Sequence, residues 1–170
     1  MIVLIGYMGS GKSTIGKVLA QQLEKDFIDF DNYIEAEEKQ SIPDIFKEKG
    51  EVYFRKKEAF YLEELLAANL NAVVSLGGGT PCFGTNMQTI IESSPNVFYL
   101  KLSVDKLISR LQPEKSYRPL IKDIADEDLS EFIRKHLFER NYYYLQAPHI
   151  VNVVEQTPEE LAVEVKEKLS

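Results

Sequence analysis

The sequence has a single cysteine, Cys82, among its 170 residues. This excludes an intrachain disulfide framework and a metal site built from cysteines alone. The apolar segments are much shorter than the ~20 residues that a membrane-spanning helix needs. Met1 leads directly into an apolar run at residues 2–5, which leaves no room for a signal or transit peptide. These absences predict a soluble, cytoplasmic protein.

Positive charge is in deficit, because 20 lysines and arginines face 27 acidic residues, for a net charge of -7. Proteins that bind DNA, RNA or anionic membranes need a surplus of Lys and Arg. The balance therefore argues against those partners, although one cleft can still be locally basic and take a small acidic substrate. The ordinary globular composition and the length predict one compact domain, 1–170, which we expect to be a monomer.

Short apolar runs alternate with segments of helical periodicity, and no repeat or Gly/Ser linker interrupts them. The runs are rich in Val and Ile, as buried parallel strands are, and cover residues 2–5, 27–30, 72–76, 96–100 and 149–154. Helical patterns cover residues 13–23, 43–49, 51–68, 85–93, 104–111, 128–145 and 158–168. This alternation predicts an α/β protein whose parallel sheet is covered by helices on both faces.

Two segments depart from the alternation. Residues 31–69 are almost wholly helical between two strands, which is more than a crossover needs, and suggest an insertion at about 31–60. Residues 112–127 contain two prolines and mixed charge, a pattern typical of a long mobile loop. Long loops in compact domains are often functional lids. A helical insertion and a lid on such a sheet indicate a small kinase.

The stretch GYMGSGKST, Gly6–Thr14, matches G-x-x-x-x-G-K-[ST] between a predicted strand and a predicted helix. Its glycines let backbone N–H groups point at phosphate oxygens, and the helix adds its positive dipole end. Lys12 is placed to reach the β- and γ-phosphates, and the Ser13 hydroxyl to ligate Mg²⁺. The flanking strand and helix disfavour a merely structural glycine turn. G-x-G-x-x-G is absent, so a dinucleotide site is not supported.

The carboxylate that such proteins use near Mg²⁺ is missing after the strand at 72–76, which runs into three glycines. The nearest substitutes are Asp29 and Asp31, at the carboxyl end of the second predicted strand. Strand alternation would place both on one side, with one carboxylate near Mg²⁺ and the other facing a substrate hydroxyl. The alternative is a polar strand-to-helix turn in which one of them is an N-cap.

Arginine is scarce, at five of the 20 basic residues. Guanidinium suits bidentate contacts with carboxylates and phosphates, so each arginine in a lysine-rich chain invites a specific role. Arg55 lies in the helical insertion, Arg118 in the predicted lid and Arg140 on the helix after it. For any one of them the alternative is a surface ion pair of little energetic weight. Arg134 is predicted to be exposed and is assigned no role.

Three consecutive glycines, Gly77–Gly79, follow the third predicted strand at the edge where ligands bind in parallel sheets. Without side chains, their backbone can approach a ligand closely. A tight turn alone would need only one or two glycines. We therefore favour close approach over a turn.

In this order the motifs resemble the shikimate kinase family, over nearly the whole chain. They are the phosphate loop, DFD at 29–31, FR with a glutamate three residues later, GGG, R…RPL and ER-x-x-Y. The loop alone is shared by many ATPases and GTPases, but the ordered set is far more specific. The resemblance implies a P-loop NTPase fold like that of nucleoside monophosphate kinases. Its five-stranded parallel sheet would have the order 2-3-1-4-5, flanked by helices, with a substrate-binding insertion and a lid.

The resemblance also implies an activity. ATP would transfer its γ-phosphoryl group to the 3-hydroxyl of shikimate, giving shikimate 3-phosphate and ADP on the route to chorismate and aromatic amino acids, with Mg²⁺ as cofactor. By motif, the implied ATP-binding residues are Gly9, Ser10, Gly11, Lys12, Ser13, Thr14, Arg110, Arg118 and Pro158. The implied metal residues are Ser13 and Asp29. The implied substrate residues are Asp31, Phe46, Phe54, Arg55, Glu58, Gly77, Gly78, Gly79 and Arg140.

Within that set, Lys12, Asp31 and Arg118 would be catalytic, with Asp31 either a true base or a group that only positions the hydroxyl. Glu58 would orient Arg55, while Phe46 and Phe54 would form an apolar wall. Two rival functions remain: a kinase of another hydroxy acid, such as gluconate, and a non-catalytic nucleotide switch. The switch would leave the acceptor-side aspartate and arginines unexplained, and the guanine-reading N-K-x-D motif is absent.

Overall fold

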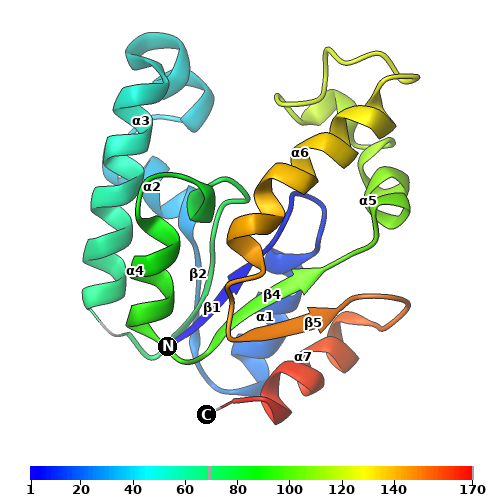
Figure 1. The fold of residues 1–170 in the computed structure, drawn as a ribbon. Coiled ribbons are helices and arrows are strands. Elements are labelled where there is room, and N and C mark those ends of the chain that lie inside the picture. Colours follow the sequence, from blue (N-terminus) through cyan, green and yellow to red (C-terminus); the bar gives the residue numbers. More distant parts are fainter. Residues whose placement is uncertain (69, 170) are drawn as a thin grey trace.

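The computed structural model describes residues 1–68 and 70–169, and a five-stranded parallel sheet lies at its centre (Figure 1). The strand order is β2-β3-β1-β4-β5, and all four neighbouring pairs are parallel. The strands are β1 Ile2–Ile5, β2 Asp26–Asp29, β3 Ala72–Ser75, β4 Val97–Lys101 and β5 His149–Asn152. Both the predicted fold class and the predicted strand order are confirmed, with strand ends within two residues of the apolar runs.

Helices cover both faces of this sheet. Their bounds are α1 Lys12–Gln22, α2 Phe30–Glu38, α3 Ile42–Ala67, α4 Asn86–Ser93, α5 Val104–Leu111, α6 Leu129–Tyr144 and α7 Pro158–Glu167, with short 3₁₀ turns η1 Thr80–Cys82 and η2 Lys115–Tyr117. Helices α1 and α7 pack side by side on one face, whereas α4 and α6 lie across the other (Figure 1). In the described part of the chain, no helix combines the length and the apolar character needed to cross a bilayer.

The central strands β1 and β3 are buried along their whole length, as the near-continuous apolar runs predict. Their apolar side chains belong to the hydrophobic core, which supports the carboxyl edge of the sheet. The loops that follow β1, β2 and β3 all leave from that edge, so residues far apart in sequence meet there.

The second strand ends earlier than its sequence suggests. Asp29 is the N-cap of α2, and its Oδ1 accepts a hydrogen bond from the Asn32 backbone N–H at 3.3 Å. Asp31 therefore lies in the first turn of α2 and not on the strand. The prediction that strand alternation places Asp29 and Asp31 on one side is wrong, because it assumed that both residues belong to the strand. A capping aspartate begins the helix one residue after the strand, so the period of two does not extend to Asp31.

Helix α3 has a break at Gly50, whose φ of 82° and ψ of 171° are not helical. Glycine is favoured there because other residues are strained at such a φ. The predicted pair of helices, 43–49 and 51–68, is therefore confirmed as two segments joined at this residue. Together with α2 they form the insertion on one side of the sheet edge (Figure 1).

The predicted lid, residues 112–127, consists of turns and the short helix η2. Ile121 is fully buried, and Lys115 pairs with Asp126 at 2.7 Å, so the segment has its own internal contacts. Its mobility stays a prediction.

Candidate active site

The phosphate loop joins β1 to α1 and turns on two glycines with positive φ, Gly9 at 77° and Gly11 at 92°. Lys12 is buried, and its Nζ donates to the carbonyl oxygens of Gly6 at 2.8 Å and Tyr7 at 3.0 Å. Burial lowers the pKa of Lys12 to about 8, with Asp31 opposing this effect and Arg118 adding to it. The ammonium group of Lys12 is thus held by backbone carbonyl groups of the phosphate loop itself.

A cavity of about 620 Å³ lies against this loop. Its walls include most of the residues predicted to handle nucleotide and metal: Gly9, Gly11, Lys12, Ser13, Thr14, Asp29, Arg110 and Arg118. Asp31, predicted to face the acceptor, also lines it. Two predicted nucleotide residues do not line it: Pro158, and Ser10, whose side chain is fully buried and whose Oγ has no hydrogen-bond partner among the described residues. Any contact of Ser10 with phosphate would therefore come from its backbone.

Ser13 and Asp29 form one polar pair at the base of this cavity. The Ser13 hydroxyl donates to Asp29 Oδ2 at 2.9 Å, while the other oxygen of Asp29 caps α2. The N-cap contact and the Ser13 contact thus use different oxygens of one carboxylate. Magnesium in phosphate sites keeps several waters and takes only one or two carboxylates, which this donor set fits. Among residues 1–68 and 70–169 there is no cluster of three or more His, Cys, Asp or Glu arranged for a metal.

A second cavity, of about 490 Å³, lies between the insertion, the triple glycine and α6. Its lining includes every residue predicted to hold the acceptor: Asp31, Phe46, Phe54, Arg55, Glu58, Gly77, Gly78, Gly79 and Arg140. Phe46 and Phe54 form one wall, with ring centroids 4.7 Å apart. Asp31, Gly77 and Gly78 line both cavities, so the two spaces meet at Asp31.

Asp31 is the carboxylate at this junction. Burial, and then the charges of Asp29 and Glu58, raise its pKa to about 6, although the charge of Lys12 acts in the opposite direction. A carboxyl group poised near neutral pH suits proton transfer or strong hydrogen bonding to a hydroxyl.

The three glycines make room for these side chains. A Cβ on Gly77 would lie 2.5 Å from Asp31 Oδ1, and one on Gly79 would lie 3.2 Å from Arg55 Nη2. A Cβ on Gly78 would lie 3.4 Å from Arg140 Nη1. The glycines are thus needed for the packing of the site's own side chains, and the predicted close approach to a ligand stays a prediction.

We expect Gly77→Ala to lower kcat more than it alters ATP binding. At 2.5 Å the new methyl group would force Asp31 to move, because real Cβ atoms do not approach an oxygen so closely. Displacing a reacting group by about 1 Å can cost about a hundredfold in rate. Steady-state kinetics with both substrates varied would measure this. An unchanged kcat would mean that the position of Asp31 is not critical.

Arg55 is held by a carboxylate and by an aromatic ring. Its Nη1 lies 2.7 Å from Glu58 Oε2, and the other oxygen of Glu58 accepts a hydrogen bond from the Thr80 hydroxyl at 2.8 Å. The guanidinium lies 3.6 Å from the centroid of the Phe83 ring. The expected contact of Glu58 with Arg55 is present. Thr80 and Phe83 were not identified from the sequence, and only their position just after the triple glycine could have signalled them.

Helix α6 brings further residues that the sequence did not single out. His136 lines the second cavity, and its Nδ1 lies 2.8 Å from the Tyr7 hydroxyl of the phosphate loop. Burial, and then the Arg140 charge, lowers the pKa of His136 to about 4, so the imidazole is neutral at physiological pH. Tyr144 donates to the Gly78 carbonyl at 2.6 Å. The helix thereby contacts both the phosphate loop and the triple glycine.

Three further arginines lie on α5, in residues 112–127 and on α6. Arg118 lines the first cavity, and its Nε donates to Glu114 Oε2 at 3.0 Å. Arg110 donates to the Gly9 carbonyl at 3.1 Å, and with Pro158 it lines a third cavity of about 230 Å³. Arg134 is exposed and pairs with Asp105 at 2.8 Å, away from all three cavities.

Comparison with known proteins identifies relatives with this fold. The family model described as shikimate kinase matches residues 8–170. A shikimate kinase of Flavobacterium johnsoniae is 44% identical over 169 residues, which cover 99% of this chain and 98% of that protein.

Solved structures agree with this assignment. A crystal structure of shikimate kinase from Bacteroides thetaiotaomicron has a TM-score of 0.89 and 36% identity, covering 98% of this chain and 96% of that one. Shikimate kinase from Acinetobacter baumannii in complex with shikimate has a TM-score of 0.86 and 31% identity, covering 99% and 94%. Similarity of this extent, over nearly the full length, is that of members of one family. The chain therefore belongs to the shikimate kinase family.

Proposed function

We propose that this protein transfers the terminal phosphoryl group of ATP to the 3-hydroxyl of shikimate. The observation that carries the proposal is the position of Asp31, at the junction of a phosphate-loop cavity and an arginine-lined cavity. ATP would occupy the first cavity, with its adenine near Arg110 and Pro158 in the third. The acceptor would occupy the second.

The chemistry of shikimate matches the second cavity. The acceptor is a small ring with one carboxylate and three hydroxyls. Arg55 and Arg140 present guanidinium groups that suit the carboxylate, and Asp31 suits a hydroxyl at the opposite end. Phe46 and Phe54 offer an apolar surface to the ring. Membership of the shikimate kinase family favours this acceptor over gluconate.

Phosphoryl transfer needs little covalent chemistry from the protein, so positioning and charge stabilisation account for most of the catalysis. Asp31 would accept a hydrogen bond from the attacking hydroxyl and take its proton as the new P–O bond forms. The bond from the γ-phosphorus to the β–γ bridging oxygen breaks at the same time, and ADP leaves with that oxygen. Lys12 and Arg118 would stabilise the negative charge on the transferring group. Ser13 and Asp29 would hold Mg²⁺, which supplies charge neutralisation at the phosphate oxygens when bound.

Water competes with the acceptor hydroxyl, so the site must be closed during transfer. Residues 112–127 are placed for this, since Pro113, Glu114 and Arg118 line the nucleotide cavity and Leu120 lines the acceptor cavity. One segment thus contacts both substrate spaces, and we propose that it acts as the lid.

ADP release measured with shikimate, gluconate and a nucleoside monophosphate tests the proposal. We expect turnover with shikimate, and background rates with the other two. Turnover with gluconate alone would replace the acceptor. ATP binding without turnover on any of the three would instead favour a nucleotide switch.

A further inference from the structure

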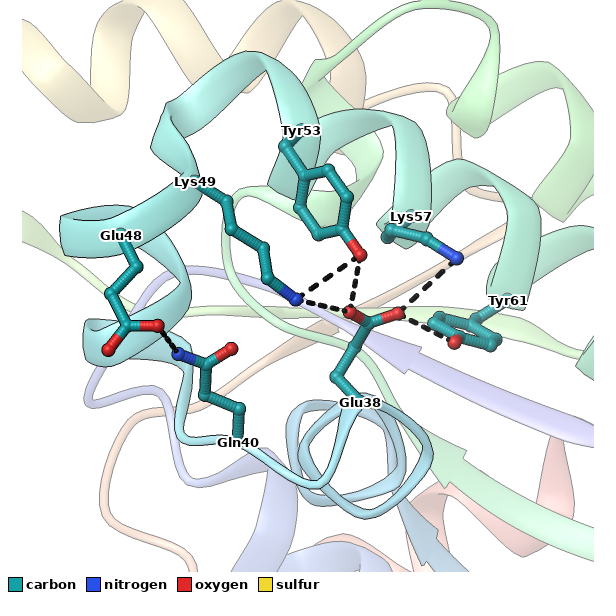
Figure 2. Close-up of polar contacts among 7 residues, drawn as sticks. All are labelled: Glu38, Gln40, Glu48, Lys49, Tyr53, Lys57 and Tyr61. Carbon is teal, nitrogen blue, oxygen red and sulfur yellow. Dashed lines mark hydrogen bonds and ion pairs between the residues drawn. The ribbon is translucent and has the colours of Figure 1, made fainter.

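Glu38, the last residue of α2, has an unusually well-satisfied carboxylate. Its side chain is 6% exposed. Its Oε2 accepts a hydrogen bond from the Tyr53 hydroxyl at 2.7 Å, and its Oε1 accepts one from the Tyr61 hydroxyl at 2.8 Å. Lys49 and Lys57 pair with it at 3.5 and 3.4 Å (Figure 2). Glu38 lines none of the three cavities described above, so none of the proposed catalytic steps uses it.

All four partners of Glu38 belong to α3, on both sides of the Gly50 break. Lys49 precedes Gly50, whereas Tyr53, Lys57 and Tyr61 follow it (Figure 2). One carboxylate therefore joins α2 to both segments of α3 and fixes the angle between them. A second contact supports this joint, because Gln40 donates to Glu48 Oε2 at 2.6 Å.

The spacing of the partners also fixes the rotation of α3 about its axis. Tyr53, Lys57 and Tyr61 are four residues apart and share one face of the helix. The residues that follow the first two, Phe54 and Glu58, lie about 100° further round and line the acceptor cavity. Arg55 comes next on the same turn. Because Glu38 anchors the face that carries the two tyrosines and Lys57, the face that carries Phe54 and Glu58 is turned toward the acceptor cavity.

We propose that Glu38 is a positioning residue for the acceptor, which holds α3 in the rotation that presents Phe54, Arg55 and Glu58. The inference rests on the proposed function only in taking the second cavity as the acceptor site. It predicts that the Glu38 contacts determine acceptor affinity, although they lie outside that cavity.

The negative charge of Glu38 contributes to this positioning role. Burial acts to raise the pKa of Glu38, but the hydrogen bonds from Tyr53 and Tyr61 and the charge of Lys57 outweigh it and lower the pKa to about 2. The carboxylate is thus ionised throughout the working pH range. Two tyrosine donors and two ammonium groups need an acceptor with two charged oxygens, which an amide cannot replace.

Glu38→Gln tests this directly, since it keeps the shape of the side chain and removes the charge. We expect the acceptor KM to rise about tenfold, while the KM for ATP and kcat at saturation change less than about twofold. Glu37→Gln is the matched control, because its neighbour Glu37 is exposed on the same helix, and it should leave all constants unchanged.

A thermal melt separates positioning from stability alone. A fall in Tm of Glu38→Gln with an unchanged acceptor KM would overturn the proposal, and so would an equal rise in the KM for ATP. If Glu38→Gln does not fold, Tyr53→Phe and Tyr61→Phe each remove one hydroxyl without altering the core, and the same KM pattern is required of them. The wild-type acceptor panel is run first, so a failure of shikimate as acceptor is seen separately from a failure of Glu38 to influence KM.

Discussion

Asp31→Asn is expected to lower kcat by about 10²–10⁴-fold, the range for loss of a general base. Asparagine keeps the size of the side chain and one oxygen acceptor, but it cannot take the proton of the attacking hydroxyl. Because Asp31 stands where the two cavities meet, the loss should appear in kcat rather than in the KM for ATP. Steady-state kinetics that measure kcat and the KM for ATP in both proteins test this expectation. A loss of less than about tenfold would assign Asp31 a positioning role only.

The pH profile provides an independent check on the same residue. The raised pKa of about 6 means that Asp31 is ionised above that pH and protonated below it. We therefore expect kcat/KM to fall as the pH drops below about 6 in the wild type, and this limb to vanish in Asp31→Asn. At the alkaline end, Lys12 should lose its charge above about pH 8, which lowers the rate in both proteins.

The same variant should be more stable than the wild type at neutral pH. In the folded protein, burial and the neighbouring charges of Asp29 and Glu58 raise the pKa of Asp31 from its ordinary value of 3.8 to about 6. Between about pH 4 and 6 the folded state therefore binds more protons than the unfolded state, so the free energy of unfolding falls as the pH rises. Above about pH 6 the folded protein bears the full free-energy cost of an ionised Asp31. Asparagine removes this cost.

Thermal melts at pH 7.5 and pH 4 measure this effect. The Tm of Asp31→Asn should exceed that of the wild type at pH 7.5, by about 2–4 °C for each kcal/mol of relieved cost, and the gap should close at pH 4. A variant that is less stable at both pH values would show that the Asp31 carboxylate is not under electrostatic strain.

How far the sequence predicts the site depends on the range of the contacts. The phosphate loop and the fully buried strands follow from local spacing and composition, since Gly9, Gly11 and Lys12 act within one turn of chain. The order of the strands came from family resemblance, because apolar runs alone do not specify which strands are neighbours.

Contacts between distant elements were the ones that sequence patterns did not reveal. The stacking of Arg55 on Phe83 and the contact of Tyr7 with His136 depend on how α3 and α6 pack against the sheet edge. Tyr53, Lys57 and Tyr61 show the four-residue spacing of any amphipathic or solvated helix face, so nothing marked them as partners of Glu38. Helix periodicity identifies a face but not what it contacts.

Arg118→Ala is expected to lower kcat by roughly tenfold to a thousandfold, as loss of one charge-stabilising donor does. Arg118 lies on the lid segment and lines the nucleotide cavity, near enough to Lys12 that its charge lowers the pKa of that lysine. In this structure its guanidinium contacts Glu114, and its side chain is 32% exposed. A modest movement of the lid would exchange the Glu114 carboxylate for phosphate oxygens.

This arrangement predicts which constants change and which do not. If Arg118 engages the phosphoryl group mainly in the transition state, kcat and kcat/KM should fall together, while the acceptor KM stays within about twofold. Arg134→Ala is the matched control, because it removes an exposed arginine paired with Asp105 and should leave kcat unaltered. Equal kcat values for Arg118→Ala and the wild type would place this arginine away from the transferring phosphate. Because Arg118 is the lid's basic residue on that cavity, closure of the lid would then serve to exclude water rather than to complete the charge around the reacting group.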